Sequence, residues 1–351
     1  MRLWSSEDNR MVDMQITVTA VVVSYNRAGL LQECLDGIAS QTRPVDRVII
    51  VDNASTDGAA DVARDHPLVA AAVSGTAKVV VLPRNVGGAG GFCAGIALAV
   101  EDGADDVQSS SRHYVWLMDD DTVPKPTALI SLLDAVDECV TENRIFPAVL
   151  GSKAVWTDGR EHLMNKPRMR GIIRKGNRFL SAPVIGDELR PYQARSMSFV
   201  SCLINVGAIR NIGRLPRASY FLWNDDFEYT TALLRKGVGY YVPASEVVHK
   251  TKVFGSSDAD PGERFYNEVR NKIWLFRFSK NNFTLVELVE FILKTIRRWT
   301  LTWLRSRNRA LILDCFRRGW HDGVYGTLEK NVDVFKDVDD VAHAVASVET
   351  D

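Results

Sequence analysis

Three consecutive aspartates, Asp119, Asp120 and Asp121, directly follow an apolar run that ends at Met118. Hard divalent cations such as Mg²⁺ prefer oxygen ligands, and a protein typically supplies one or two carboxylates while phosphate oxygens supply much of the rest. The three aspartates are therefore a candidate site for a cation that binds a diphosphate. A solvated acidic turn or the first turn of a helix would explain the same residues.

A glycine-rich segment, residues 84–92, could bring the backbone close to a ligand. It begins with Arg84 and Asn85 and has glycines at positions 87, 88, 90 and 91. A helix from Phe92 onward would offer its N-terminus to an anion. The segment follows a later strand and lacks the spacing of the dinucleotide-binding fingerprint, which argues against a nicotinamide-dependent oxidoreductase. A tight turn between a strand and a helix is the alternative.

A third group contains acidic residues among aromatic ones, where Trp223 precedes Asp225, Asp226 and Glu228. A well-placed aspartate or glutamate can remove the proton of a hydroxyl group, so one of the three is a candidate general base. For any single acid in this group, helix capping or ordinary surface charge is the alternative.

His249 lies at the end of a predicted strand over residues 242–248 and is a candidate metal ligand or diphosphate donor. It lies 23 residues after Asp226 in the chain. A single histidine is usually structural, so this prediction depends on the acidic groups that accompany it.

These residues need a framework, and the apolar pattern predicts an alternating α/β domain with a mainly parallel sheet. Nearly all-apolar runs predict buried strands over residues 16–23, 47–51, 78–82 and 114–118. Helical stretches separate them, and Asn26 is a candidate cap for the first. Polar residues directly follow all four strands, where parallel sheets bind their ligands, so the pattern predicts a nucleotide-type site.

The rest of the chain divides by composition. Residues 151–195 look irregular and basic, an apolar run over residues 199–206 restores order, and residues 285–320 have helical spacing. The predicted organisation is a flexible N-terminal extension, the α/β domain, a basic amphipathic helical region and an acidic tail that is flexible or loosely docked, over residues 1–15, 16–280, 281–326 and 327–351.

Composition excludes several classes of protein. The chain has 351 residues, of which 46% are hydrophobic and 25% charged, with a net charge of -1, so it is neither disordered nor a protein that coats nucleic acid. Its five cysteines are scattered and predict a reducing compartment rather than a disulfide framework. Neither a signal peptide nor a spanning apolar stretch is recognisable.

Taken together, the motifs resemble the inverting glycosyltransferases of family 2, which have the GT-A fold. Residues 22–27 and 51–58 look like their nucleotide-binding half. Residues 85–92 and 118–121, with Trp223 to Asp226 and then His249, resemble the bacterial galactofuranosyltransferases that build mycobacterial cell-wall galactan. The resemblance covers about residues 17–280 and implies an α/β fold with a Rossmann-like nucleotide-binding sheet.

The resemblance also implies roles for particular residues. The nucleotide-sugar site would comprise Ser24, Tyr25, Arg27, Asp52, Asn53, Ser55, Arg84, Asn85, Gly87, Gly88 and Asp120. Mn²⁺ or Mg²⁺ would be bound by Asp119, Asp121 and His249. Asp226 would be the base, with Asp225 holding a sugar hydroxyl and Glu228 in support. Apolar walls would come from Trp223 and Trp116.

The implied activity is transfer of galactofuranose from UDP-galactofuranose to a polyprenyl-diphosphate-linked saccharide, at the cytoplasmic face of the cell membrane. The short chain favours an initiating enzyme over a polymerising one. The alternatives are a rhamnosyltransferase or another family 2 hexosyltransferase, a non-catalytic nucleotide-sugar-binding protein, and a nucleotidyltransferase. Basic and aromatic residues alternate over residues 283–320, which suits either an anionic membrane surface or a helical cap on the domain.

Overall fold

The first third of the chain forms the parallel half of the sheet, as the sequence predicts. The computed structural model describes residues 15–73, 75–101, 110–169, 187–254 and 260–349, so the predicted N-terminal extension lies almost wholly outside the described residues. Strands β1, β2, β3 and β4 lie in the order β3-β2-β1-β4 and span Thr17–Ser24, Arg47–Asp52, Ala77–Val81 and His113–Asp119. Their register pairs Ser24 with Asp52 and Val23 with Asp119, so the polar residues after these strands meet at one edge.

The other half of the sheet is mixed, which corrects the expectation of a mainly parallel sheet. Strand β9 (Cys202–Asn205) runs antiparallel between β4 and β6, and β10 (Gly239–His249) runs parallel to β6. The remaining strands β5, β6, β7 and β8 span Thr122–Pro124, Val149–Val155, Arg168–Met169 and Tyr192–Ser196. The segment predicted to be irregular therefore contains strands. Antiparallel pairing of β10 with β5 sets His249 opposite Thr122, next to the aspartates.

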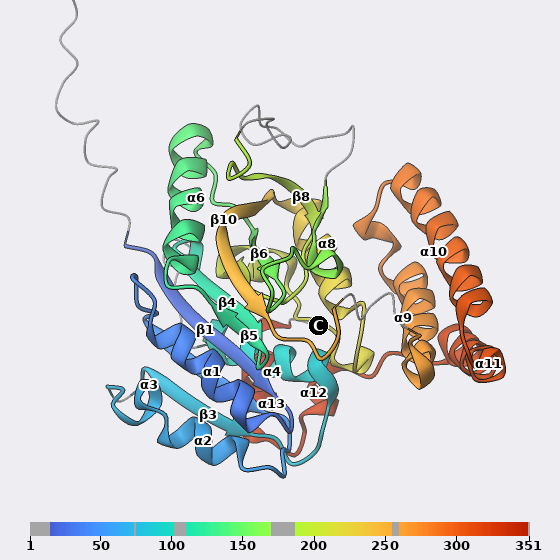
Figure 1. Ribbon diagram of the computed structural model, residues 1–351, viewed down its shortest axis with the longest axis horizontal. Coiled ribbons are helices and arrows are strands. Elements are labelled where there is room, and N and C mark those ends of the chain that lie inside the picture. Colours follow the sequence, from blue (N-terminus) through green and yellow to red (C-terminus); the bar gives the residue numbers. More distant parts are fainter. Residues whose placement is uncertain (1–14, 74, 102–109, 170–186, 255–259, 350–351) are drawn as a thin grey trace, which may run out of the picture.

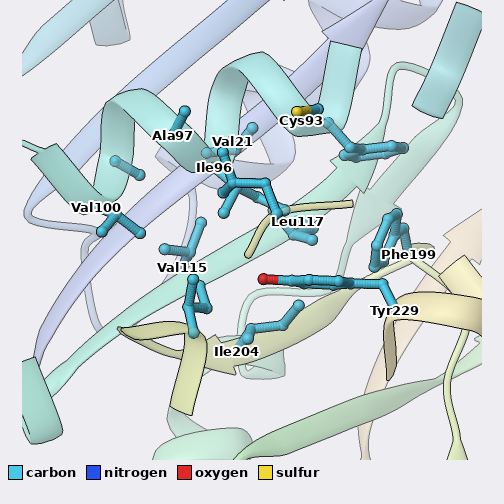
Figure 2. Packing of buried hydrophobic residues seen from close by; sticks show 14 of the residues in the cluster. Val21, Cys93, Ile96, Ala97, Val100, Val115, Leu117, Phe199, Ile204 and Tyr229 are labelled. Atoms are coloured by element: carbon cyan, nitrogen blue, oxygen red, sulfur yellow. The ribbon is translucent and has the colours of Figure 1, made fainter. Parts of the chain in front are cut away.

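Helices cover both faces of the sheet and enclose two hydrophobic cores. On one face lie α1, α2 and α6, over Ala28–Ala39, Ala59–Asp65 and Ala128–Asn143, with the short α3 (Pro67–Ala70). On the other face α4 (Gly87–Glu101) lies across β1 and β4, where Ile96 and Val100 pack near Val115 and Leu117 (Figure 2). Helices α7 (Val206–Ile212) and α8 (Asp225–Lys236) complete this second core.

Helix α4 begins at Gly87, five residues earlier than predicted, so the glycines belong to its first turns. A β-carbon on Gly91 would lie 2.4 Å from Val23 and one on Gly95 would lie 2.3 Å from Val21. The absence of side chains therefore lets this helix pack directly on β1. Gly91 and Gly95 thus serve the close packing of a helix on a strand.

Three helices form a separate bundle at one side of the molecule (Figure 1). Helices α9, α10 and α11 span Phe265–Phe278, Leu285–Arg305 and Arg309–Tyr325, and their shared core includes Phe265, Trp299 and Ile312. This bundle begins at Phe265 and not at the predicted boundary near residue 281. Short 3₁₀ turns lie at Leu163–Asn165, Ala218–Tyr220, Gly262–Arg264 and Lys280–Asn282. Among the described helices, none is both long enough and apolar enough to cross a membrane.

The acidic C-terminal segment is docked on the α/β domain, contrary to the prediction of a loose tail. Helices α12 (Asn331–Val334) and α13 (Asp339–Val348) place Phe335, Val341 and Val345 in the same core as α4. Asn331 also binds the backbone at Pro216 and Ala218. The acids of α13 are exposed while Val341, Ala344, Val345 and Val348 are buried, and overall composition does not distinguish these two faces of the helix.

Candidate active site

The loop after β1 is tied to the aspartates after β4. Asp120 accepts hydrogen bonds from the Ser24 hydroxyl at 3.2 Å and from the Tyr25 amide at 3.0 Å. Arg27 lies 3.1 Å from Asp120 and 2.7 Å from Asp121, so its guanidinium bridges the two carboxylates. Five of the residues expected at the nucleotide-sugar and metal sites are thus in contact, and Asp120 holds the loop that carries Ser24, Tyr25 and Arg27.

Asn26 is not the cap of α1, because its side chain binds the loop after β2. Its Oδ1 accepts a hydrogen bond from the Thr56 amide at 2.7 Å, and its own amide donates to the Ser55 hydroxyl at 2.9 Å. Asp57 takes over the capping role by accepting from the Ala28 amide at 2.8 Å. The loops after β1 and β2 are therefore fixed to one another.

Asp121 and His249 form the second part of the site. The Nε2 atom of His249 lies 3.3 Å from Oδ1 of Asp121, and its Nδ1 atom lies 2.9 Å from Oδ1 of Asn165. Burial alone would raise the pKa of Asp121, but His249 and Arg27 outweigh burial and hold that pKa below its ordinary value. The Asn165 contact orients the imidazole ring so that Nε2 faces the carboxylate.

Asp119 is held among like charges. Burial, followed by the charges of Asp121 and Asp120, raises its pKa well above the ordinary value, and Asp225 on α8 contributes in the same direction. The first turn of α8 therefore lies near enough to the end of β4 for the two acidic groups to interact. A cation between them would relieve this repulsion.

The donor atoms fit Mn²⁺ or Mg²⁺ in part. Oδ1 of Asp121 is buried and makes no hydrogen bond of good geometry, although His249 is nearby. Within the described residues, no three His, Cys, Asp or Glu side chains gather closely enough to form a complete protein-only metal site. Mg²⁺ commonly has few protein ligands and takes the others from phosphate and water, so the Asp121 carboxylate suits it, while the imidazole of His249 favours a transition-metal ion such as Mn²⁺. The role of Asp119 as a third ligand remains a prediction.

The nucleotide end of the candidate site centres on Asp52, which is fully buried at the end of β2. Its Oδ2 accepts a hydrogen bond from the Ser55 amide at 3.1 Å, whereas its Oδ1 has no partner. Asn53 beside it binds the backbone, donating to the Gly87 carbonyl and accepting from the Val86 amide. A buried acceptor without a donor is the feature expected of a group that binds a ligand N–H.

The glycine-rich turn places only some of its residues where a ligand could meet them. Gly87 has φ +74°, and a β-carbon there would lie 2.0 Å from the Phe221 carbonyl oxygen, so packing requires this glycine. A β-carbon on Gly88 would meet nothing within 4 Å, which leaves that position open. Asn85 accepts from the Gly87 amide, and Arg84 donates to the Val334 carbonyl at 2.9 Å. Arg84 thus contacts the C-terminal segment, and its contact with a donor remains a prediction.

Glu228 is fully buried and fully engaged. It accepts two hydrogen bonds from Arg214, at 2.7 and 3.1 Å, and one from the Ser279 hydroxyl at 2.5 Å. Burial would raise its pKa, but Arg214 and Arg217 lower it below the ordinary value. A carboxylate held by two guanidinium groups is a weak base, so Glu228 anchors α8 and does not fit the fallback role of proton acceptor.

Asp226 is the acid of α8 that lines a cavity. This cavity of about 220 Å³ is also lined by Trp223, Lys272 and Arg298. Burial raises the pKa of Asp226 to about 6, against the opposing effects of the Phe227 amide and Lys272. The neighbouring Asp225 is raised to a pKa of about 8 by burial and by the charge of Asp226. The pair therefore offers one carboxylate with the basicity of a general base near neutral pH.

Comparison with known proteins places this geometry in a family. The sequence profile of glycosyl transferase family 2 matches residues 19–198, which include the ends of β1, β2 and β4. The chain belongs to glycosyltransferase family 2. Galactofuranosyltransferase GlfT1 of Mycobacterium tuberculosis is 30% identical over 265 residues, which are 72% of this chain and 80% of that protein. GlfT1 of Mycolicibacterium smegmatis is 35% identical over 116 residues, which are 33% of each chain.

Solved structures establish the fold of this glycosyltransferase as the GT-A-like α/β fold that its motifs predict. The crystal structure of S. aureus TarS superposes with a TM-score of 0.55 at 16% identity, covering 95% of this chain and 55% of that chain. TarS 1–349 in complex with UDP-GlcNAc superposes with a TM-score of 0.52 at 14% identity, covering 95% and 91% of the two chains.

The two tryptophans expected as walls of the glycosyltransferase site differ. Trp223 lines the cavity beside Asp226, and the Arg264 guanidinium lies 5.5 Å from its ring centre. Trp116 is fully buried, donates from Nε1 to the Ser201 hydroxyl at 3.0 Å, and has its ring enclosed in the hydrophobic core. The expectation for Trp116 is wrong because β4 is covered on both faces, and its side chain enters the core beneath α1 and α6.

Several residues of the glycosyltransferase cavity carry no recognisable sequence motif. Lys272 on α9 and Arg298 on α10 reach it from the helical bundle, and Arg168 reaches it from β7. Asn165, which orients His249, comes from a 3₁₀ turn. A lysine within the buried face of α9 is the signal that could have been noticed, because a buried cation needs an anionic partner.

Proposed function

We propose that this glycosyltransferase transfers galactofuranose from UDP-galactofuranose to a lipid-linked saccharide, with inversion and with Mn²⁺ or Mg²⁺ bound. The observation that carries the proposal is the 30% identity to GlfT1, which extends over 80% of that galactofuranosyltransferase. The acidic groups after β4 and at the start of α8 support the proposal. The first group would hold the metal ion that neutralises the diphosphate, and the second would supply the general base.

The residues after β1 and β2 would bind the UDP half of the donor. The free Oδ1 atom of Asp52 is suited to accept a hydrogen bond from the N–H group of uracil. Arg27 would exchange part of its contact with Asp120 and Asp121 for the diphosphate. A metal ion held by Asp121 and His249 would neutralise charge on the leaving diphosphate.

Asp226 would act on the acceptor. As the acceptor oxygen bonds to the anomeric carbon, the bond from that carbon to the diphosphate oxygen breaks and the hydroxyl proton passes to the Asp226 carboxylate. Asp225, protonated at neutral pH as its raised pKa of about 8 implies, would donate a hydrogen bond to a sugar hydroxyl. The described cysteines are all buried, in keeping with a displacement that needs no covalent enzyme intermediate.

A donor screen tests the proposal directly. UDP-galactofuranose, UDP-galactopyranose, UDP-glucose and dTDP-rhamnose would each be offered to the purified protein with a lipid-linked disaccharide. We expect a preference for UDP-galactofuranose of about a hundredfold or more in kcat/KM, because a site that pairs sugar hydroxyls rejects sugars that leave its buried groups unpaired. Turnover of dTDP-rhamnose without turnover of UDP-galactofuranose would identify the protein as a rhamnosyltransferase instead.

We further propose that α10 holds the enzyme on the cytoplasmic face of the membrane. One stripe of this helix is apolar and exposed: Val286, Val289, Leu293 and Ile296 recur every three or four positions, and Trp303 and Leu304 follow near the end of the helix. The exposed basic residues Lys294, Arg297, Arg298 and Arg305 accompany it. An exposed apolar stripe beside basic groups suits an anionic lipid surface.

Leu293→Glu is expected to weaken binding to phosphatidylglycerol-containing vesicles by about tenfold or more, because it replaces an exposed leucine that would enter the lipid with a charged side chain. Leu189→Glu is the matched control, since both leucines are 62% exposed and Leu189 lies outside α10. Vesicle sedimentation measures both variants. Equal binding of the two variants would remove the membrane role, and a dimer that Leu293→Glu alone dissociates would assign the stripe to a second copy of the chain.

A further inference from the structure

The cavity beside Asp226 is unusually rich in cations. Lys272 is only 4% exposed, and Arg168 and Arg298 line the same space. Burial lowers the pKa of Lys272 to about 8, and although Glu268 opposes this effect, Arg168 and Arg298 reinforce it. The three cations therefore repel one another across a small volume.

The described acidic side chains near these three cations form no ion pair with them. In the described part of the chain, no ion pair within 4 Å involves Lys272, Arg168 or Arg298. Two acids line the same cavity: Glu268 is engaged through Oε2 by the Asn224 side chain while its Oε1 has no hydrogen-bond partner among the described residues, and Asp226 accepts from the Phe227 amide. A buried ammonium group beside two exposed guanidinium groups, none of them in an ion pair with a described residue, constitutes a site for an anion from outside the protein.

Aromatic rings support two of these cations. The Lys272 ammonium lies 4.8 Å from the ring centre of Phe227 and 4.4 Å from that of Phe291. The Arg168 guanidinium lies 4.9 and 4.8 Å from the same two rings. Cation–π contacts hold both groups without consuming their hydrogen-bond donors, which stay free for a ligand.

The same rings form the wall of a long groove. This groove of about 900 Å³ runs between α10 and the strands β7 and β8, and its apolar lining comprises Met169, Phe227, Phe283, Val286 and Phe291. Phe227 and Phe291 stack at 4.8 Å between ring centres. Its two acids are neutralised, since Glu287 pairs with Arg195 and Glu290 with Lys294. Arg168 and Phe227 line both spaces, so the groove adjoins the cationic cavity.

We propose that the cavity and the groove together form the acceptor site, in which Lys272, Arg168 and Arg298 bind the phosphate groups of a lipid phosphate and the aromatic groove binds its chain. Charge complementarity selects an anion, and the apolar lining selects a hydrocarbon chain attached to it. Val286 belongs both to the groove and to the exposed stripe of α10, so the chain would enter from the lipid surface. This inference rests on the proposed function and names the binding site of its acceptor.

Binding of soluble probes to the full chain tests this site without catalysis. The probes are farnesyl diphosphate, farnesol and inorganic pyrophosphate, titrated calorimetrically below the concentration at which micelles form. We expect farnesyl diphosphate to bind about tenfold or more tightly than either of the others, because only it engages both the cations and the groove.

Two neighbouring arginines on α10 provide a matched pair of variants. Arg297 and Arg298 are both exposed, and only Arg298 lines the cavity. We expect Arg298→Gln to weaken farnesyl diphosphate about tenfold and farnesol less than about twofold, because it removes one charge from the phosphate contact. Arg297→Gln should leave both affinities within about twofold. Val286→Glu, at an exposed position, should weaken farnesyl diphosphate and farnesol alike.

UDP binding in the same samples distinguishes a failure of the proposed acceptor site from a failure of the proposed function. If UDP binds while farnesyl diphosphate does not, or if Arg297→Gln and Arg298→Gln have equal effects, the acceptor site is wrong and the proposed transfer stands. If farnesol binds as tightly as farnesyl diphosphate, the cations have no part in recognition and the inference also fails. If the wild-type protein binds no UDP, the proposed function itself fails.

Discussion

Asp226→Asn is expected to lower kcat by about 10²–10⁴ while UDP affinity stays within about twofold, because the substitution keeps the size of the side chain and removes its basicity. Asp226 lines the cavity proposed to bind the acceptor, and the described lining of that cavity contains no residue of the loops after β1 and β2. The loss should therefore appear in the chemical step. The measurements are kcat in steady state and the Kd for UDP by calorimetry.

The pH dependence of kcat gives a second readout of the same group. Burial raises the pKa of Asp226 to about 6, and a base must be ionised to accept a proton. The wild-type kcat should therefore reach its maximum near pH 7 and fall tenfold per pH unit as the pH drops below about 6. This limb should vanish from the residual activity of Asp226→Asn.

The neighbouring acids serve as controls. Asp225→Asn should lose less activity than Asp226→Asn, since an amide can still donate a hydrogen bond to a sugar hydroxyl. Glu228→Gln should destabilise the protein by about 3–5 kcal/mol, because Arg214 is left without its buried carboxylate partner. Its kcat per folded molecule should be near normal. Normal kcat in Asp226→Asn with loss of kcat in folded Glu228→Gln would transfer the role of base to Glu228.

Local sequence patterns were sufficient to predict the half of the fold that positions the nucleotide. Each of the first four strands is an apolar run followed by polar residues, and parallel pairing places those ends at one edge. The antiparallel insertion of β9 between β4 and β6 is not encoded locally, because a buried strand has the same composition in either direction. The docking of α13 on α4 joins segments far apart in the chain, and its charged outer face concealed its apolar inner face.

The candidate site divides in the same way. The aspartates after β4 and the acids at the start of α8 stand in recognisable motifs, whereas Lys272, Arg168 and Asn165 reach the site only through tertiary packing. Trp116 shows the converse case. Its position next to the aspartate motif predicts a wall of the ligand site, but its side chain is a core residue. A residue next to a motif in the chain therefore belongs to the same site only where its side chain also faces that site.

Asp121→Asn is expected to abolish metal-dependent turnover and to weaken Mn²⁺ binding in the presence of UDP by about a hundredfold or more. Loss of a group that merely orients a ligand typically costs 10- to 100-fold, and loss of the ligand itself should cost at least as much. The amide keeps the shape of Asp121, and its oxygen can still accept a hydrogen bond from Arg27, so the fold should persist.

Calorimetry with Mn²⁺ and UDP measures the loss, and activity in excess EDTA measures the need for a cation. Asp61→Asn is the matched control, because Asp61 is exposed on α2 and pairs only with Arg64 among the described residues. His249→Gln should weaken Mn²⁺ in the same direction, since Nε2 of His249 faces Oδ1 of Asp121 at 3.3 Å. Full wild-type activity in EDTA would show instead that the pair serves the diphosphate directly, with His249 and Arg27 as its cationic partners.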